Sequence, residues 1–257
     1  MSARHHYRNP PVEEALCEFR FEPGRDWNLT IPGRLQSVLG SAYSGKLREQ
    51  KAIEVDLGVR DGLLPGLQYR QGLTKVQLVT TDGKRLVGVG KDSLSIHMLR
   101  PYRHQCDEGR GGWEEFKPRI FEALDAYWQV AEPKGVNRVG VRYINKLVIP
   151  HGSVELEDYL VCGLPRTVAL PETVSSFVSR VEYAFPDTVR LVLTLGTVPA
   201  SREEVQQFLL DLDVIRESTE PLDQRQEFSA VEELHARERE VFESVITDEA
   251  RRLFDAH

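Results

Sequence analysis

The stretch RVGVRYINK, residues 138–146, alternates polar and apolar side chains and predicts a long β-strand near the middle of the 257-residue chain. Side chains of a strand point alternately to its two faces, so Arg138, Arg142 and Lys146 lie together on one face. The apolar side chains between them, such as Val141, point to the other face. If this strand lies at the centre of a sheet, the basic row lies on the open face of that sheet.

The residues before this strand predict the order strand, helix, four strands, helix. Polar and apolar residues alternate over residues 15–21, Thr30 is a predicted helix N-cap, and aromatic residues recur at helical spacing from Trp113 onward. The four strands between the helices are predicted at residues 52–57, 67–80, 85–89 and 94–99, and the second of them is expected to break near Gly72. Asp82-Gly83 favours a hairpin, through a type I′ turn that needs positive φ at both central residues.

The residues from position 138 onward predict strand, helix, three or four strands, helix. The predicted elements are a strand at residues 138–149, a short helix capped by Ser153, and strands at residues 174–185, 188–198 and 207–215. Ser229 and Glu232 have the spacing of a capping box and predict the start of a long helix, and Thr247-Asp248 starts a shorter one. We expect the charged face of the long helix to be solvated; it consists of Glu232, Glu233, Arg237, Glu238, Arg239 and Glu240.

The repeated order predicts an α+β fold made of two duplicated halves, residues 1–135 and residues 136–257, fused into one domain. Runs of hairpin-linked strands followed by a helix favour an antiparallel sheet with helices on one face over a doubly wound parallel sheet. The predicted topology is similar to the TATA-binding-protein-like architecture, in which two such halves form one curved sheet. That similarity concerns the fold and carries no function. An accidental similarity of order is the alternative, because the halves share no evident residue-level identity.

Three segments carry a resemblance to a known group of proteins. They are NPPV at residues 9–12 with EALCEFRF at residues 14–21, RVGVRYINK at residues 138–146, and the closing segment 234–248. Together they resemble a sporadically distributed family of bacterial proteins of about this length that has no established activity. The resemblance implies a cytoplasmic, patchily inherited prokaryotic protein, of a kind common on mobile or defence islands. It supplies no catalytic residues.

The composition limits the classes of function. Lys and Arg number 33 against 40 Asp and Glu, and the net charge of −7 argues against a chain that wraps nucleic acid non-specifically, although a local basic groove stays compatible with it. The amino end has no apolar signal-peptide core, and no stretch approaches the roughly 20 apolar residues of a membrane span. We therefore expect a cytoplasmic protein without a membrane segment. The 3 cysteines are too few and too scattered for a disulfide framework.

The basic row is the first candidate site. Arg138, Arg142 and Lys146 could line a groove for phosphate, another anion or nucleic acid on the open face of the sheet. The alternative is a solvated face on which these cations pair across strands with carboxylates such as Glu18 and Glu182.

The second candidate site is the pair Asp211 and Asp213 in LLDLDVI. Alternation places both carboxylates on one face of a strand, where they could share a hard divalent cation. A metal-dependent nuclease would need a third acid, for which Glu182 on a neighbouring strand is the candidate. The alternative is an ordinary acidic strand face, because no lysine or histidine base lies at a recognisable spacing.

Two further motifs are rejected. His97, His104 and Cys106 match no zinc-ligand spacing. Gly90-Lys91 lacks the upstream glycine, the following Ser or Thr and the helix of a phosphate-binding loop. The sequence therefore predicts no catalytic residue and no cofactor.

These observations favour a non-enzymatic protein that binds a protein partner or a second copy of itself, in a bacterial defence or mobile-element context. A nucleic-acid-binding protein that uses the basic sheet face is the first alternative. A metal-dependent nuclease or hydrolase at the two aspartates is the second.

Overall fold

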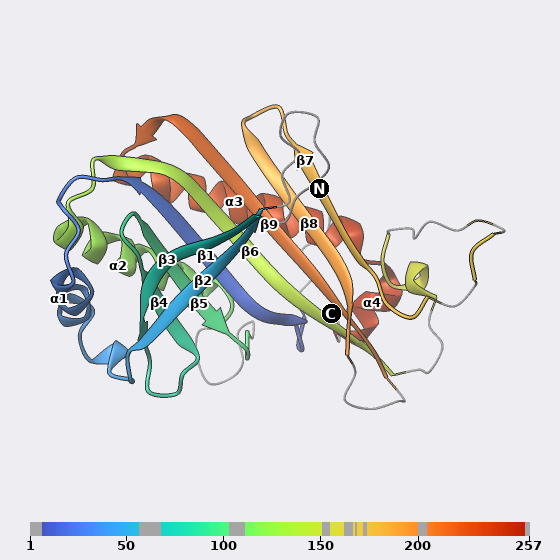
Figure 1. The fold of residues 1–257 in the computed structure, drawn as a ribbon. Helices are drawn as coiled ribbons and strands as arrows, with labels where there is room; N and C mark the ends of the chain where they lie inside the picture. Colours follow the sequence, from blue (N-terminus) through green and yellow to red (C-terminus); the bar gives the residue numbers. More distant parts are fainter. Residues whose placement is uncertain are drawn as a thin grey trace.

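One antiparallel sheet forms the body of the protein, and Figure 1 shows its open face. The computed structural model describes residues 7–56, 68–102, 111–150, 155–161, 167, 169–171, 174–199 and 205–254. Within these residues the sheet has nine strands in the order β2-β3-β4-β5-β1-β6-β9-β8-β7, and each neighbouring pair is antiparallel. The predicted α+β class with a large antiparallel sheet is confirmed.

Most strand bounds lie within four residues of the predicted ones, but β9 extends beyond the predicted end at residue 215, and β3 continues through Gly72, where a break is predicted. In chain order the strands are β1 Val12–Glu22, β2 Arg48–Asp56, β3 Gln68–Val79, β4 Arg85–Val89, β5 Ser93–Leu99, β6 Gly135–Ile149, β7 Val178–Ala184, β8 Val189–Val198 and β9 Gln206–Leu222. The central pair is β1 and β6, and the edges are β2 and β7. Residues 57 and 67, which ended two predicted strands, lie outside the described residues.

The helices are α1 Thr30–Leu39 with the 3₁₀ turn η1 Gly40–Tyr43, α2 Trp113–Ala131, the 3₁₀ turn η2 Leu156–Asp158, α3 Gln224–Val245 and α4 Asp248–Leu253. In Figure 1 the long helix α3 passes behind the sheet, and α1 lies beside the strands at the left of the view. α2 packs against β5 and α1, whereas α3 packs against β6 and β9. In the described part of the chain, no helix is both long and apolar enough to cross a bilayer.

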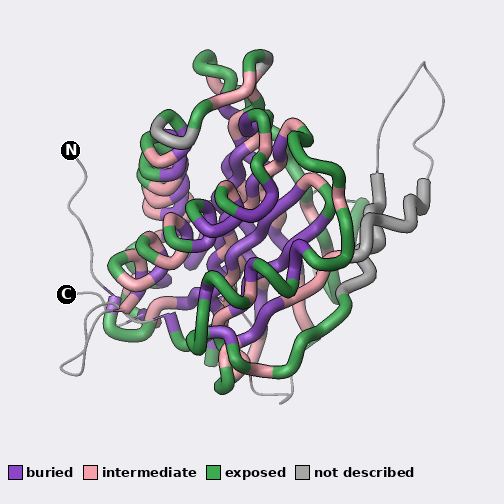
Figure 2. Tube along the Cα trace, turned by 90° about the vertical axis from the view of Figure 1, so that its left-hand side faces the viewer, coloured by how far each residue is buried: buried purple, intermediate pink, exposed green. Residues whose placement is uncertain are grey.

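The core fills the space between the sheet and these helices, where the buried residues gather in Figure 2. Cys17 of β1 lies opposite Val141 of β6, which lies opposite Val214 of β9, and all three side chains are fully buried. Alternation therefore separates the two faces of the central strands as the sequence predicts. The apolar set packs under the helices, and Arg138 and Arg142 lie on the open face.

The turn at Asp82-Gly83 is a hairpin, but it is not type I′. The Thr80 carbonyl accepts a hydrogen bond from the Gly83 N–H at 2.9 Å, and the chain resumes pairing when the Thr80 N–H donates to the Arg85 carbonyl at 3.0 Å. Gly83 has a φ of 71°, whereas Asp82 is not among the residues with positive φ. Residues 81–84 lie between this bonded pair, so the loop is longer than a two-residue type I′ turn, and only its glycine adopts the left-handed conformation.

The capping box of the long helix occurs earlier than Ser229. The Asp223 carboxylate accepts from the Gln226 N–H at 2.9 Å, and the Gln226 side chain accepts from the Asp223 N–H at 2.9 Å. Ser229 lies inside α3, where its hydroxyl donates to Glu233. The prediction of a cap at Ser229 was therefore wrong, because an Asp/Gln pair satisfies the orphan N–H groups first.

Two other predicted helices have different outcomes. Ser153 lies outside the described residues, and the short helix expected after it is only the 3₁₀ turn Leu156–Asp158. The final helix is confirmed, because the Thr247 hydroxyl caps α4 by accepting from the Ala250 N–H. A capping hydroxyl thus lies outside its helix and points back into the first turn.

Replacing the observed cap should cost more stability than replacing the expected one. Asp223→Ala removes the acceptor for the first turn of α3, so we expect the free energy of unfolding to fall by about 1 kcal/mol. Ser229→Ala is the matched control and should change it by less than about 0.5 kcal/mol. Urea unfolding at pH 6 measures both variants, and equal losses would contradict the assignment.

Candidate functional site

The open face of the sheet brings the two predicted candidate sites together. Arg142 of β6 lies opposite Asp213 of β9, and the next outward residue, Ile144, lies opposite Asp211. The basic row and the acidic pair are therefore neighbours on adjacent strands. Ligand binding at either site stays a prediction.

Arg142 and Asp211 form a bidentate ion pair. The Arg142 Nε and Nη2 donate to the two carboxylate oxygens of Asp211 at 2.8 Å and 2.6 Å. These hydrogen bonds raise the pKa of Arg142, and Asp211 is 7% exposed. Burial raises the pKa of the neighbouring Asp213, although Arg138 and Arg142 act to lower it. Both predicted metal ligands therefore face arginine side chains.

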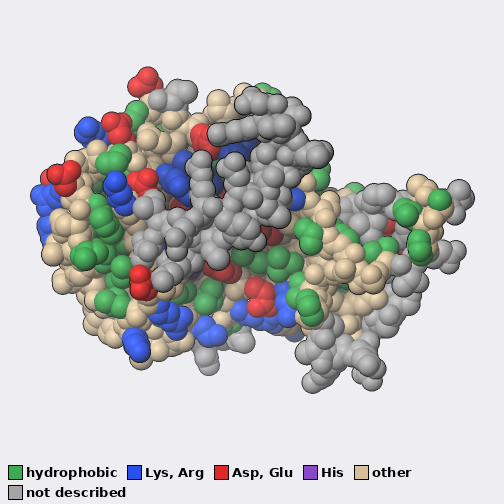
Figure 3. Space-filling view, in the orientation of Figure 1, with side chains coloured by type: hydrophobic (Ala, Val, Ile, Leu, Met, Phe, Trp, Pro, Cys, Tyr) green, Lys and Arg blue, Asp and Glu red, His purple; other side chains and the backbone are tan. Residues whose placement is uncertain are grey.

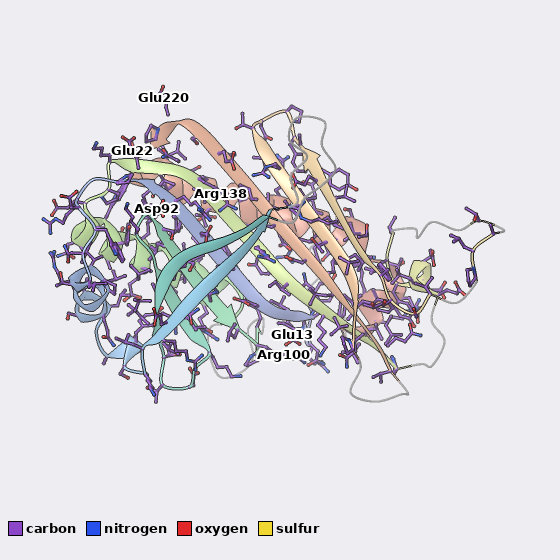
Figure 4. All side chains as sticks on the ribbon, viewed as in Figure 1. Glu13, Glu22, Asp92, Arg100, Arg138 and Glu220 are labelled. Carbon is purple, nitrogen blue, oxygen red and sulfur yellow. The ribbon has the colours of Figure 1, made fainter. Side chains whose placement is uncertain are left out.

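Arg138 is bound to a carboxylate that also holds a lysine. Figure 4 labels Arg138 on the open face of the central strands, where its Nη1 lies 2.8 Å from Glu18 Oε1. The other Glu18 oxygen lies 2.7 Å from Lys75 Nζ, and Arg20 Nε lies 3.3 Å from Oε1. Burial alone would raise the pKa of Glu18, but Lys75, Arg138 and Arg20 outweigh it and lower the pKa to about 2. Glu18 is thus the centre of a cationic cluster.

The ion pairs continue from this cluster to the edge of the sheet. Arg138 Nε lies 4.0 Å from Glu217, whose carboxylate lies 2.9 Å from Arg190. Arg190 in turn contacts Glu182 at 3.4 Å, and Glu182 contacts Arg180 at 2.7 Å. We call this row of ion pairs from β1 to β7 the ion-pair row. In Figure 3 acidic and basic side chains accordingly lie interspersed on the visible part of this face.

Lys146 differs from the two arginines of the basic row. Among the described residues no carboxylate lies within ion-pair distance of its ammonium group, and it is only partly exposed. Two of the three predicted cations therefore have carboxylate partners, as the alternative interpretation of this face expects. The described residues contain no group of three or more His, Cys, Asp and Glu side chains that could hold a metal ion.

Small residues allow Lys75 to reach Glu18 across two strands. Lys75 belongs to β3, and β4 and β5 separate it from β1. A Cβ atom built on Gly90 would lie 3.4 Å from the Lys75 Cγ and 2.5 Å from the Ser93 Oγ. The aliphatic part of the Lys75 side chain therefore passes close to Gly90, where a larger side chain would occupy the same space.

A serine, a histidine and a glutamate that the sequence pattern does not single out converge on the same face. The His97 Nδ1 lies 2.6 Å from Glu14 Oε1, and its Nε2 lies 3.0 Å from the Ser95 Oγ. The order of atoms is that of a hydrolase triad. Ser95 is only 2% exposed, however, and its hydroxyl also contacts the Gly88 carbonyl. A substrate carbonyl has no access to this oxygen. The hydrogen bonds of the cluster instead connect side chains of β1 and β5.

The rejected motifs gain no support from the structure. His104 and Cys106 lie outside the described residues, so the spacing argument against zinc rests on the sequence alone. The Gly90 N–H donates to the Ser93 carbonyl at 2.8 Å, which places Gly90-Lys91 in the hairpin turn from β4 to β5. A strand rather than a helix follows this glycine-lysine pair, so no phosphate-binding loop forms here.

A small cavity lies on the helix side, between the segment from Tyr7 to Val12, β6 and α3. Its volume of about 50 Å³ leaves room for water, and its walls include Tyr102, Tyr143, His235 and Glu238. The Tyr143 hydroxyl lies 2.9 Å from the Tyr102 hydroxyl and 3.2 Å from the His235 Nδ1. The cavity therefore combines aromatic walls with a short polar chain.

Glu238 contradicts the expected solvated face of the long helix. Its side chain is 4% exposed, and burial raises its pKa to about 8 although Arg239 opposes the shift. Glu227, three turns earlier on the same helix, is fully buried, and neither carboxyl oxygen has a hydrogen-bond partner among the described residues. Burial also raises its pKa to about 8. Helical periodicity could have placed both glutamates on the face of Leu234, but their charge suggested the opposite.

The edge strand β7 directs half of its backbone groups away from the sheet and exposes apolar side chains. The Phe185 N–H donates to the Val189 carbonyl, and the Thr197 N–H donates to the Phe177 carbonyl. In an antiparallel ladder alternate residues bond to the neighbour, so the odd-numbered residues of β7 bond to β8. The even-numbered residues direct their backbone groups outward. The exposed side chains are Val178, Val181 and Tyr183, at 77%, 39% and 48%.

No protein-family model matches this chain, and a search of the curated proteins finds no match either.

Neutralising Glu18 should weaken the fold at neutral pH. The pKa of about 2 lies below the reference value of 4.5, so the ionised carboxylate stabilises the fold above pH 4.5 and this contribution is lost as the pH falls towards 2. Glu18→Gln should cost on the order of 3 kcal/mol at pH 7. Glu13→Gln, at the exposed ion pair with Arg100 seen in Figure 4, is the control and should cost little. Denaturant unfolding from pH 7 to pH 2 that gives parallel curves for Glu18→Gln and the wild type would contradict the assignment.

Glu238 and Glu227 should make the protein less stable as the pH rises. Their pKa values of about 8 lie above the reference value of 4.5, so the stability present below pH 4.5 is lost as the pH rises through 8. Glu238→Gln should reduce this slope and stabilise the protein at pH 8 by more than about 1 kcal/mol, with little effect at pH 4.5. Glu240→Gln, at an exposed position of the same helix, should leave the profile unchanged. Thermal unfolding across this range measures it, and a Glu238→Gln profile identical to that of the wild type would refute the burial argument.

Proposed function

We propose that this chain is a non-enzymatic protein that binds a protein partner by strand addition at β7. The observation that carries the proposal is the outer edge of this strand, where backbone N–H and C=O groups point away from the sheet beside exposed Val178, Val181 and Tyr183. An edge of this kind is a template for pairing with another chain. Strand addition supplies affinity through backbone hydrogen bonds and specificity through the side chains that flank them.

The ion pairs of the open face favour this function over the two alternatives. A nucleic acid that bound the basic row would have to displace Asp211 from Arg142 and Glu18 from Arg138. A metal at Asp211 and Asp213 would have to compete with the same arginines. Both alternatives need the charged face to rearrange, whereas strand addition at β7 uses outward backbone groups for which no other described strand competes.

We also propose that the two halves of the chain arose by duplication, with a TATA-binding-protein-like topology. The strand order supports this, since β1 pairs with the last strand of its half, β5, and β6 pairs with the last strand of its half, β9. Among the described elements the second half has one strand fewer and a 3₁₀ turn where the first half has α1. A cytoplasmic location and a defence or mobile-element context rest on the resemblance and are proposals of the same kind.

Site-specific photo-crosslinking in the native host tests the proposed docking strand. A photoreactive amino acid at Tyr183 should give a discrete crosslinked product, because this side chain is on the edge strand. The same group at Leu29, which is 87% exposed at the start of α1, is the control and should give none.

Glu182→Pro sharpens the crosslinking test. Proline removes an outward N–H group without removing a bond to β8, so it should abolish the product while the fold is retained. Circular dichroism and thermal unfolding check the fold. A product that survives Glu182→Pro, or no product from Tyr183 at all, would contradict strand addition at β7.

A further inference from the structure

We infer that the occupant of β7 is β7 of a second copy of this chain, paired antiparallel about a two-fold axis at Val181. The inference rests on the proposed function and names its partner. Three properties of the strand support it: which backbone groups point outward, how its charges are ordered, and where its exposed apolar side chains lie. The two sheets would join into one continuous sheet across the axis.

The backbone restricts the registers that two copies of β7 can adopt. The groups directed away from the sheet belong to Val178, Arg180, Glu182 and Ala184, because the odd-numbered residues bond to β8. Residues opposite each other can exchange both backbone hydrogen bonds only if both belong to this even-numbered set. A two-fold axis must therefore pass through a residue of β7 and not between two residues.

The charges select one of the remaining registers. An axis at Arg180 would place two arginines opposite each other, and an axis at Glu182 would place two glutamates opposite each other. An axis at Val181 places Arg180 of each copy opposite Glu182 of the other and Val178 opposite Ala184. Opposite charges directly across an antiparallel pair are stabilising, whereas like charges are destabilising. This register also pairs all four outward residues.

The same register buries the apolar side chains of the other face. Val181 would meet its own copy, and Tyr183 would lie opposite Ser179 of the second copy. Val181 and Tyr183 are 39% and 48% exposed in the single chain, so pairing removes apolar surface from water. On the open face Arg180 and Glu182 end the ion-pair row, which would be continuous with the ion-pair row of the second copy.

Charge exchange between two variants tests the partner and the register together. Arg180→Glu alone and Glu182→Arg alone place like charges opposite each other in the symmetric pair, so each variant should be monomeric. In an equimolar mixture the two acidic side chains of the Arg180→Glu chain lie opposite the two basic side chains of the Glu182→Arg chain, so the mixture should form heterodimers. Sedimentation equilibrium over a dilution series measures the mass of each sample, and the wild type should be dimeric at high concentration.

Three outcomes would overturn the inference. They are a wild-type protein that stays monomeric at every concentration, single variants that dimerise as the wild type does, and a mixture of folded variants that stays monomeric. A monomeric wild type that still gives a proline-sensitive crosslink from Tyr183 to a different protein would refute the second copy while the proposed function stands. Loss of both results would refute the two proposals together.

Discussion

β1 and β6 pair antiparallel through the centre of the sheet, and alternation places Glu18, Arg138 and Arg142 on one face of this pair, opposite the core face of Cys17 and Val141. On one face this pairing aligns Cys17 with Val141 and gives α2 and α3 a continuous apolar surface to cover. On the other face it brings Glu18 within reach of Arg138. A slip of one residue would exchange the two faces, so burial of the core also fixes the register of the charges.

The fixed register explains why the open face is a connected set of ion pairs. Arg142 pairs with Asp211 and Arg138 pairs with Glu18. Acidic and basic side chains continue to alternate along the ion-pair row as far as Glu182 and Arg180. Pairs of this kind contribute little individually where they are exposed, and more where both partners are largely buried, as Glu18 is. The ion-pair row ends at β7, one of the two edge strands of the sheet, at Arg180 and Glu182. The charges that end this row and the outward backbone groups therefore lie on the same edge strand.

Local patterns predicted the elements well, and tertiary contacts decided the details. Alternation placed Arg138 and Arg142 on one face correctly, because that property depends only on the strand itself. Their carboxylate partners depend on strand pairing. The local sequence pattern is therefore equally compatible with Asp211 as a metal ligand and with Asp211 as the partner of Arg142. The cap at Asp223 was missed because two capping boxes compete in the same segment. The buried Glu238 was missed because charge is a poor guide to burial where a helix packs over a cavity.

The triad-like cluster combines a local sequence pattern with a contact between two strands. Ser95 and His97 occupy alternate positions of one strand, which is visible in the sequence, but Glu14 reaches them only through the pairing of β1 with β5. The geometry then resembles a catalytic site, and burial of Ser95 excludes the chemistry in this arrangement. Distances alone therefore do not define a site. Access must be established as well.

Amide hydrogen exchange along β7 tests the central claim most directly. Ser179, Val181 and Tyr183 bond to β8 and serve as the internal reference, because their amides should be protected at every protein concentration. The account predicts that the amides of Val178, Arg180, Glu182 and Ala184 become protected as the concentration rises and lose protection on dilution. Fast exchange of these four amides at all concentrations would contradict pairing between two copies of β7.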